Sequence, residues 1–117
     1  MRKEFAAAGL CAVLAVGCST FKVPTERFAA ADAAIRAADE VGASKTPASA
    51  YQIQLAKDEA LRARELAAEG ENERAHNLLL RAQADAELAQ ALAREAPLRA
   101  QAQEAMNKAK ALEASPR

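Results

Sequence analysis

The sequence is short of the residue types on which many catalytic and binding sites depend. Its 117 residues include no tryptophan, one tyrosine, one histidine, two cysteines and four glycines. A single histidine cannot complete a carboxylate-bridged di-metal site, which needs two Glu-x-x-His motifs. The sequence also has no glycine-rich phosphate-binding loop. These shortages argue against metal and nucleotide chemistry.

An excess of one charge is missing too. The 16 basic residues balance the 16 acidic ones, which gives a formal net charge of zero. The central arginines at 62, 64, 74 and 81 alternate with acidic residues along the chain, so no basic patch is expected. Because a nucleic-acid-binding surface needs such a patch, DNA and RNA are not expected partners.

Large apolar side chains are also scarce, whereas alanine is abundant. Leu, Ile, Val and Phe make up about 16% of the sequence after residue 17. Chains with less than roughly 20% of these residues are expected to be disordered if they also carry a high net charge. This chain lacks the high net charge, and its 34 alanines favour helix. An alanine methyl buries little surface. We therefore expect thin helices, a shallow core and little room for an enclosed pocket.

The N-terminus has the organisation of a bacterial export signal. Arg2 and Lys3 precede an apolar run from Phe5 to Val16, which ends at the small residue Gly17 before Cys18. The run has about 12 residues, whereas a membrane-spanning helix needs about 20. A cleaved signal over residues 1–17 is therefore favoured over a transmembrane helix.

The segment Ala15-Val16-Gly17-Cys18 resembles the lipobox of bacterial lipoproteins, although Ala15 stands where leucine is preferred. The resemblance implies signal cleavage between Gly17 and Cys18, diacylglycerol on the Cys18 sulfur and an acyl chain on its new amino group. No other cofactor is expected. Ser19 is not the aspartate that retains such proteins in the inner membrane, which implies the periplasmic face of the outer membrane. The alternative is ordinary signal cleavage, which leaves a soluble periplasmic protein.

The two cysteines do not predict a disulfide. Cys11 lies within the apolar run of the signal, so Cys18 is the only cysteine left after cleavage. A lone thiol cannot form an internal disulfide in an oxidising compartment. Lipidation would account for it.

The remainder of the chain predicts an all-α fold. Apolar residues recur at steps of three and four over 25–41, 47–69, 72–96 and 98–113. The helix starts and stops are Pro24, Gly42, Thr46-Pro47, Gly70 with Asn72, and Pro97. The short turn at Gly70 predicts an antiparallel helical hairpin with the first helix packed alongside, as in a three-helix bundle. Proline in a helix predicts a kink or break near Pro97. The chain thus divides into a signal (1–17), a lipid-anchored tether (18–24), a helical domain (25–96) and a helical extension (97–117).

A seam of mostly small residues should hold these helices together. The seam is expected at Phe28, Ile35, Leu55, Ala63, Leu66, Leu78, Ala82, Ala86 and Ala89, with Tyr51 also in the core and Leu88 widening the stripe. Small residues let two helices approach closely. Asp32 with Arg36, and Asp58 with Arg62, are expected to pair four residues apart on the solvent face.

No constellation in the sequence indicates a catalytic or metal site. His76 follows Glu73 by three residues, but the second Glu-x-x-His motif is missing, so His76 is expected at the surface. The serines fall in the tether, in loops or at helix starts, where helix capping explains them. The prediction is a protein that is not an enzyme.

The order of these elements resembles a known family over about 70 residues, from Pro24 to Ala93. The Thr46-Pro47 restart and the segment Ala84-Asp85-Ala86-Glu87-Leu88-Ala89 follow the lipobox-like cysteine and an alanine-rich first helix. This pattern resembles the bacterial lipoproteins catalogued as domain of unknown function 4398. The resemblance implies a periplasmic helical module and carries over no catalytic residues.

The expected function is therefore that of a non-enzymatic outer-membrane lipoprotein. Its helical module would support envelope structure or recruit a periplasmic partner. The alternatives are a soluble periplasmic binding or chaperone-like protein and a self-associating coiled-coil spacer. The membrane, through the lipid, and a periplasmic protein or a second copy are the expected partners, while no motif supports contact with peptidoglycan.

Overall fold

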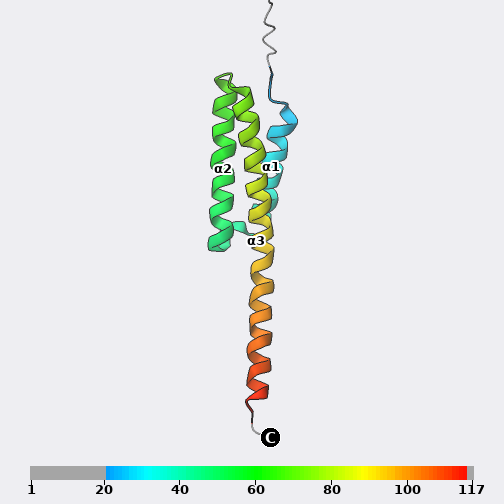
Figure 1. Ribbon diagram of the computed structural model, residues 1–117. Coiled ribbons are helices and arrows are strands. Elements are labelled where there is room, and N and C mark those ends of the chain that lie inside the picture. Colours follow the sequence, from blue (N-terminus) through cyan, green and yellow to red (C-terminus); the bar gives the residue numbers. More distant parts are fainter. Residues whose placement is uncertain (1–20, 116–117) are drawn as a thin grey trace, which may run out of the picture.

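The computed structural model describes residues 21–115 as three α-helices and one short 3₁₀ turn (Figure 1). The elements are α1 (Thr25–Glu40), η1 (Ala43–Lys45), α2 (Pro47–Ala68) and α3 (Asn72–Glu113). This described part of the chain contains no strand. The predicted all-α fold, a helical hairpin with an N-terminal helix alongside, is confirmed.

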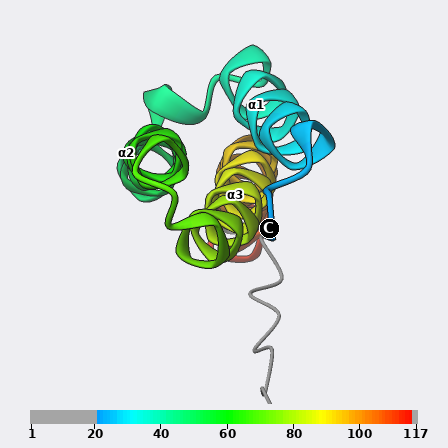
Figure 2. The same ribbon diagram turned by 90° about the horizontal axis from the view of Figure 1, so that it is seen from above.

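The three helices pack as a small bundle from which α3 continues alone. Seen along the bundle, α1, α2 and α3 stand at the corners of a triangle (Figure 2). α2 and α3 form the hairpin, and α1 packs more extensively on α3 than on α2. The last part of α3 extends well beyond the other helices (Figure 1).

Two glycines with positive φ shape the turns. Gly42 has a φ of 78° and Gly70 a φ of 84°. Glycine adopts positive φ values readily because it has no Cβ atom, whereas other residues rarely do. At the end of α2, the N–H of Glu71 donates to the Leu66 carbonyl at 2.8 Å, and that of Gly70 donates to the Ala67 carbonyl at 3.1 Å. This is a Schellman motif, which satisfies the last carbonyls of the helix while the chain reverses.

The core consists mainly of alanine, as the composition predicts. Two adjoining clusters run along the bundle, and Leu79 and Ile53 are large side chains within them. Of the predicted seam, Ala63, Leu66, Ala82, Ala86 and Ala89 are buried, whereas Phe28, Ile35, Leu55 and Leu78 are half-buried. Such short side chains let the helices lie close together.

Two predicted core positions are wrong. Tyr51 is 66% exposed, and Leu88 also faces solvent. Two residues along a helix is a rotation of about 200°. Tyr51 precedes the buried Ile53 by two residues and Leu88 follows the buried Ala86 by two, so both point away from the core.

Of the kink or break predicted at Pro97, the break does not occur, because α3 runs without interruption from Asn72 to Glu113. A proline removes one backbone donor and crowds the carbonyl four residues before it, here that of Ala93. The neighbouring alanine, leucine, arginine and glutamine residues are strong helix formers, and they extend the helix on both sides. From Pro97 onward every described residue is exposed.

The predicted ion pairs along single helices are replaced by other contacts. Asp32 of α1 accepts from Arg64 of α2 at 2.7 Å, and Asp39 of α1 pairs with Lys57 of α2 at 2.8 Å. Arg62 pairs with Glu65 instead of Asp58. Exposed pairs of this kind contribute about 0–1 kcal/mol each. Two of these pairs join α1 to α2.

The connection between α1 and α2 is held by a buried serine. The Ser49 hydroxyl is fully buried, donates to the Ala43 carbonyl at 2.5 Å and contacts the Thr46 hydroxyl. Thr46 is the N-cap of α2, but its side chain bonds no backbone N–H of the helix.

Among residues 21–115, no helix combines the length and the apolar character needed to cross a bilayer.

Candidate interaction surfaces

The residues predicted for export and lipidation lie outside the described part of the chain. Gly17, Cys18 and Ser19 precede Phe21, where the description begins. The structure therefore does not place the anchor. It does place the chain that follows the anchor.

The end of the tether lies on the bundle near the start of α3. Val23 packs against the core cluster that contains Leu79. The rings of Phe21 and His76 meet edge to face, with centroids 5.6 Å apart and an angle of 87° between planes. The tether therefore approaches the bundle at the end that carries the α2–α3 turn (Figure 1).

This contact corrects the prediction that His76 is a plain surface residue. His76 is half-buried, and its Nδ1 is buried without a hydrogen-bond partner among the described residues. Phe21, Glu73, His76 and Asn77 line an open hollow of about 340 Å³ beside it. No three His, Cys, Asp or Glu side chains within residues 21–115 gather closely enough to hold a metal ion. His76 thus serves as a packing surface for Phe21.

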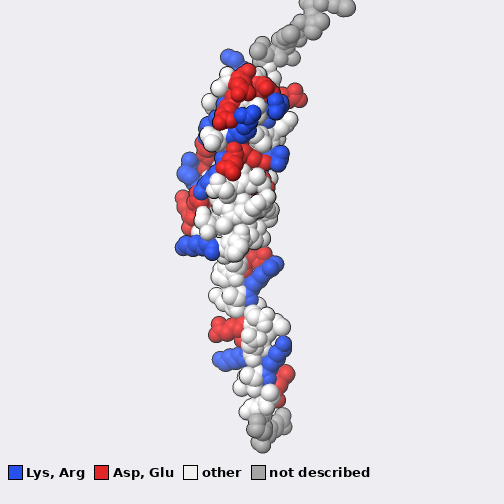
Figure 3. Space-filling model, turned by 90° about the vertical axis from the view of Figure 1, so that its left-hand side faces the viewer, with Lys and Arg blue, Asp and Glu red and all other residues white. Residues whose placement is uncertain are grey.

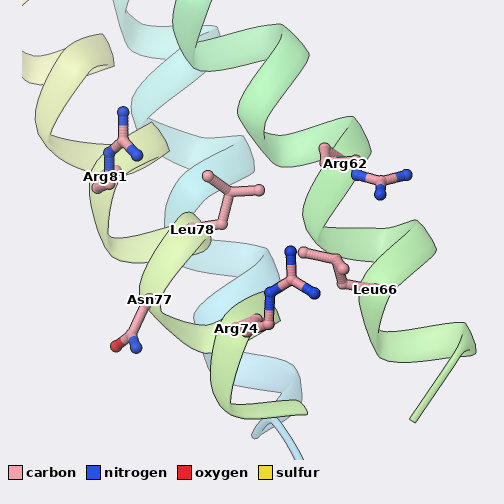
Figure 4. A pocket seen from close by; sticks show the side chains of 6 residues that line it. All are labelled: Arg62, Leu66, Arg74, Asn77, Leu78 and Arg81. Carbon is pink, nitrogen blue, oxygen red and sulfur yellow. The ribbon is translucent and has the colours of Figure 1, made fainter. Parts of the chain in front are cut away.

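A second open hollow, of about 270 Å³, lies between α2 and α3. Leu66 and Leu78 point into the space between the two helices, and three arginines stand around them (Figure 4). The lining residues are Arg62, Leu66, Arg74, Asn77, Leu78 and Arg81.

The three arginines of this groove are already neutralised. Arg62 pairs with Glu65 at 2.8 Å, Arg81 with Glu59 at 2.7 Å, and Arg74 with Glu71. Basic and acidic side chains also intermingle on the bundle face that Figure 3 shows. The groove is therefore a weak candidate for an anion site.

One charged side chain is buried between α2 and α3, and the sequence analysis did not single it out. Glu59 is only 7% exposed, and its Oε2 has no hydrogen-bond partner among the described residues. Burial raises the pKa of the Glu59 carboxyl, the neighbouring carboxyl of Asp85 raises it further, and the charge of Arg81 opposes both. The signal was in the sequence, because Glu59 sits between Ala56 and Ala63 at the spacing of the buried stripe.

The outward face of α3 carries the most extended apolar surface. Nine large hydrophobic side chains are exposed among the described residues, and five of these lie on α3. The five are Leu80, Leu88, Leu98, Met106 and Leu112. Exposed apolar surface on this scale is typical of contact sites for other proteins.

The geometry defines a class, a small all-α bundle with an alanine-rich core, open grooves and one projecting helix. Scans of the chain against family models, curated proteins and solved structures find no match. The assignment of function therefore rests on the chain's own residues.

Proposed function

We propose that this chain is a non-enzymatic lipoprotein, anchored through Cys18 to the periplasmic face of the outer membrane. Its helical bundle would act there as an interaction module of the cell envelope. The resemblance to the lipoproteins catalogued as domain of unknown function 4398 is part of this proposal.

The spacing between Cys18 and the bundle carries the proposal. Cys18 of the lipobox-like segment lies only three residues before Phe21, which already contacts His76, and α1 begins at Thr25. Lipid chains on Cys18 would therefore hold the bundle next to the bilayer. Two or more acyl chains give lasting attachment, since each buried methylene contributes about 0.8 kcal/mol.

The shape of the bundle supports a role in binding another protein. Both hollows described above are open, and the arginines of the hollow between α2 and α3 are paired with acidic side chains. By contrast, α3 presents exposed leucine and methionine side chains along most of its length. A partner helix suits this surface better than a small ligand does.

Replacement of the modified cysteine tests the anchor. We expect Cys18→Ser to prevent lipidation and the cleavage that depends on it, and globomycin added to cells expressing the parent chain to block that cleavage. The Cys18→Ser protein should also leave the membrane fraction. Cys11→Ser is the matched control and should change neither property. Unchanged processing and membrane association in Cys18→Ser would refute the anchor, and a cleaved parent chain found in the soluble fraction would favour the soluble periplasmic alternative.

A separate experiment tests whether the protein resides in the outer or the inner membrane. Ser19→Asp should move the protein from outer-membrane to inner-membrane fractions of a density gradient, while Ser19→Asn should leave it in the outer membrane. If the parent chain already sediments with the inner membrane, the outer-membrane assignment fails although the anchor stands.

A further inference from the structure

The exposed apolar side chains of α3 follow one stripe of the helix, interrupted by Glu95 between Ala91 and Leu98, which we call the outer ridge. At about 100° per residue, all its members fall within an arc of roughly 120°. The outer ridge consists of Leu80, Ala84, Leu88, Ala91, Leu98, Ala102, Ala105, Met106, Ala109 and Leu112, all exposed. It runs along both the bundle part of α3 and the projecting part.

Packing within the described chain does not explain the ridge. The side of α3 that faces α1 and α2 is buried up to Ala93, and at about 100° per residue its continuation mixes Glu104 and Asn107 with Ala100 and Ala111. The ridge, on the opposite side, stays apolar to Leu112 although every residue from Pro97 onward is exposed. The projecting helix therefore keeps an apolar face that nothing among residues 21–115 covers.

The spacing of the ridge is that of a two-stranded coiled coil. Leu88, Ala91, Glu95 and Leu98, and then Ala102, Ala105, Ala109 and Leu112, follow one another at alternating steps of three and four. Apolar residues at such steps form the contact seam between two packed helices. Glu95 is the one charged member, and within the chain it pairs with Arg99 at 2.8 Å.

We propose that the outer ridge binds a second copy of this chain in an antiparallel arrangement. The projecting part of α3, residues 97–113, would lie on the ridge of the partner's bundle part, residues 80–96. Both stretches have about 17 residues, or roughly 25 Å of helix. A two-fold axis near Pro97 would pair residues 97–113 of each copy with residues 80–96 of the other. The outer ridge would thus be complementary to itself.

At the Leu88 layer this register places a large side chain against a small one. Leu88 meets Ala105 of the second copy, and Ala91 meets Ala102 of the second copy, twice over by symmetry. Alternation of large and small residues across a seam is the packing that fills it without voids. Ala91 with Ala102, and Ala84 with Ala109, form layers of alanine that allow a short distance between the helices. At the central layer Glu95 lies beside Leu98 of the second copy.

The same register also matches charges. Glu87 comes beside Lys108 of the second copy, at positions that flank the apolar seam. Within residues 21–115, Glu87 accepts only a neutral hydrogen bond from Gln83, and Lys108 forms no ion pair. In the antiparallel register the two Glu95 side chains lie in adjacent layers, each beside Leu98 of the second copy, whereas a parallel arrangement would set them directly opposite each other, where like charges oppose pairing.

The inference rests on the proposed role as an interaction module but not on the lipid anchor. The antiparallel arrangement puts the two N-terminal ends of the bundles roughly 70 Å apart, at opposite ends of the dimer. Two anchors at opposite ends can both enter one bilayer if the dimer lies along its surface.

Engineered cysteines on the full-length chain test the arrangement in intact cells. In Ala91→Cys/Ala102→Cys, mild oxidation should link position 91 of one copy to position 102 of the other, giving a covalent dimer on a non-reducing gel. Within one copy these positions are roughly 16 Å apart along the helix, too far for a disulfide. The parent chain, which keeps Cys11 and Cys18, gives the background.

The two single variants decide the orientation. Ala91→Cys and Ala102→Cys should each remain at the background level, because the antiparallel register separates each position from its own copy. A dimer from Ala102→Cys alone would show a parallel pair and overturn the proposal, and so would the absence of dimer in the double variant. Both positions are exposed, so neither substitution disturbs the bundle.

A charge exchange in the double-cysteine background tests the register. Lys108→Glu should reduce the yield of cross-linked dimer, and adding Glu87→Lys should restore it. Failure of the second substitution to restore the dimer would overturn this register. Because the readout is cross-linking and not fractionation, a failed dimer leaves the anchor proposal standing, and a failed anchor leaves the dimer standing.

Discussion

Among the described residues, Glu59 is the only charged side chain that the bundle buries, and its surroundings act on it in opposite directions. Burial and the neighbouring carboxyl of Asp85 favour the protonated carboxyl, while Arg81 favours the carboxylate. The net effect is a raised pKa. A carboxyl whose pKa is higher in the folded state stabilises the fold below its unfolded pKa and loses that contribution as the pH rises through the folded pKa.

We therefore predict that Glu59→Gln removes a pH-dependent part of the free energy of unfolding. Relative to the parent, the variant should gain stability as the pH rises from about 4.5 to neutrality, because glutamine does not ionise. Chemical denaturation followed by circular dichroism at several pH values, in a Cys18→Ser background, measures this. Glu40→Gln, at an exposed position, is the control and should run parallel to the parent. A parallel curve for Glu59→Gln itself would contradict the prediction.

Leu79 is the largest apolar side chain that the described bundle buries completely, at 1% exposure. Its neighbours Ala31, Ala60, Ala63 and Ala82 are too short to fill the space that its removal would leave. We expect Leu79→Ala to lower the free energy of unfolding by about 2–5 kcal/mol. Leu61→Ala removes the same atoms from an exposed position of α2 and should cost no more than about 0.5 kcal/mol. Denaturant unfolding of the two variants should separate them clearly, and similar losses in both would contradict this account of the core.

At the scale of single elements, the helix ends were the most predictable feature of the fold. Thr46-Pro47 and Gly70 mark the start and end of α2 to within about a residue, because each signal acts through its own backbone geometry. The partners of charged residues were not predictable in this way. Asp32 could bond Arg36 on its own helix or Arg64 on another, and only the packing of α1 against α2 decides between them.

Pro97 also shows that a local sequence rule does not decide the structure by itself. The local rule predicts an interruption, but the helix-forming residues on both sides carry α3 through it. The missing hydrogen bond still weakens the helix locally. The projecting part from Pro97 onward, which is exposed throughout, has no tertiary contacts among the described residues to compensate.

We predict that Pro97→Ala strengthens the projecting helix and leaves the bundle unchanged. Proline is about 3 kcal/mol less favourable than alanine inside a helix. Hydrogen exchange followed by mass spectrometry should show slower exchange over residues 98–113 and the same exchange over α1 and α2. Ala100→Ser, three residues further along, changes helix propensity only slightly and is the control. Equal exchange in parent and Pro97→Ala would indicate that the proline does not limit the helix.

On the scale of the whole molecule, the alanine content predicts the nature of the core but not which apolar stripe stays exposed. It predicted thin helices and a shallow core, and the buried positions of the bundle are indeed mostly alanine. It did not predict which apolar stripe would remain outside, because Leu88 and Leu98 fit a helical stripe as well as the buried Leu79 does. Only the assembled bundle shows that the alanine seam is used within the chain and that the outer ridge is left uncovered.

The last prediction concerns the thermal stability of the whole chain, which should depend on protein concentration. Association of folded copies through the outer ridge adds a stabilisation that grows with concentration. In a Cys18→Ser background, the Tm of the parent should therefore rise over a hundredfold range of concentration. Deletion of residues 98–117 removes the projecting half of the ridge but no residue that the bundle buries, since the buried positions of α3 end at Ala93. The shortened chain should keep the parent's dilute-solution Tm and show no dependence on concentration. Leu98→Glu/Leu112→Glu, which keeps the full length, should behave like the shortened chain, because two charges then face the apolar seam. A Tm that rises with concentration equally in all three proteins would show that the copies associate through another surface. A parent Tm that does not depend on concentration would contradict association through the outer ridge.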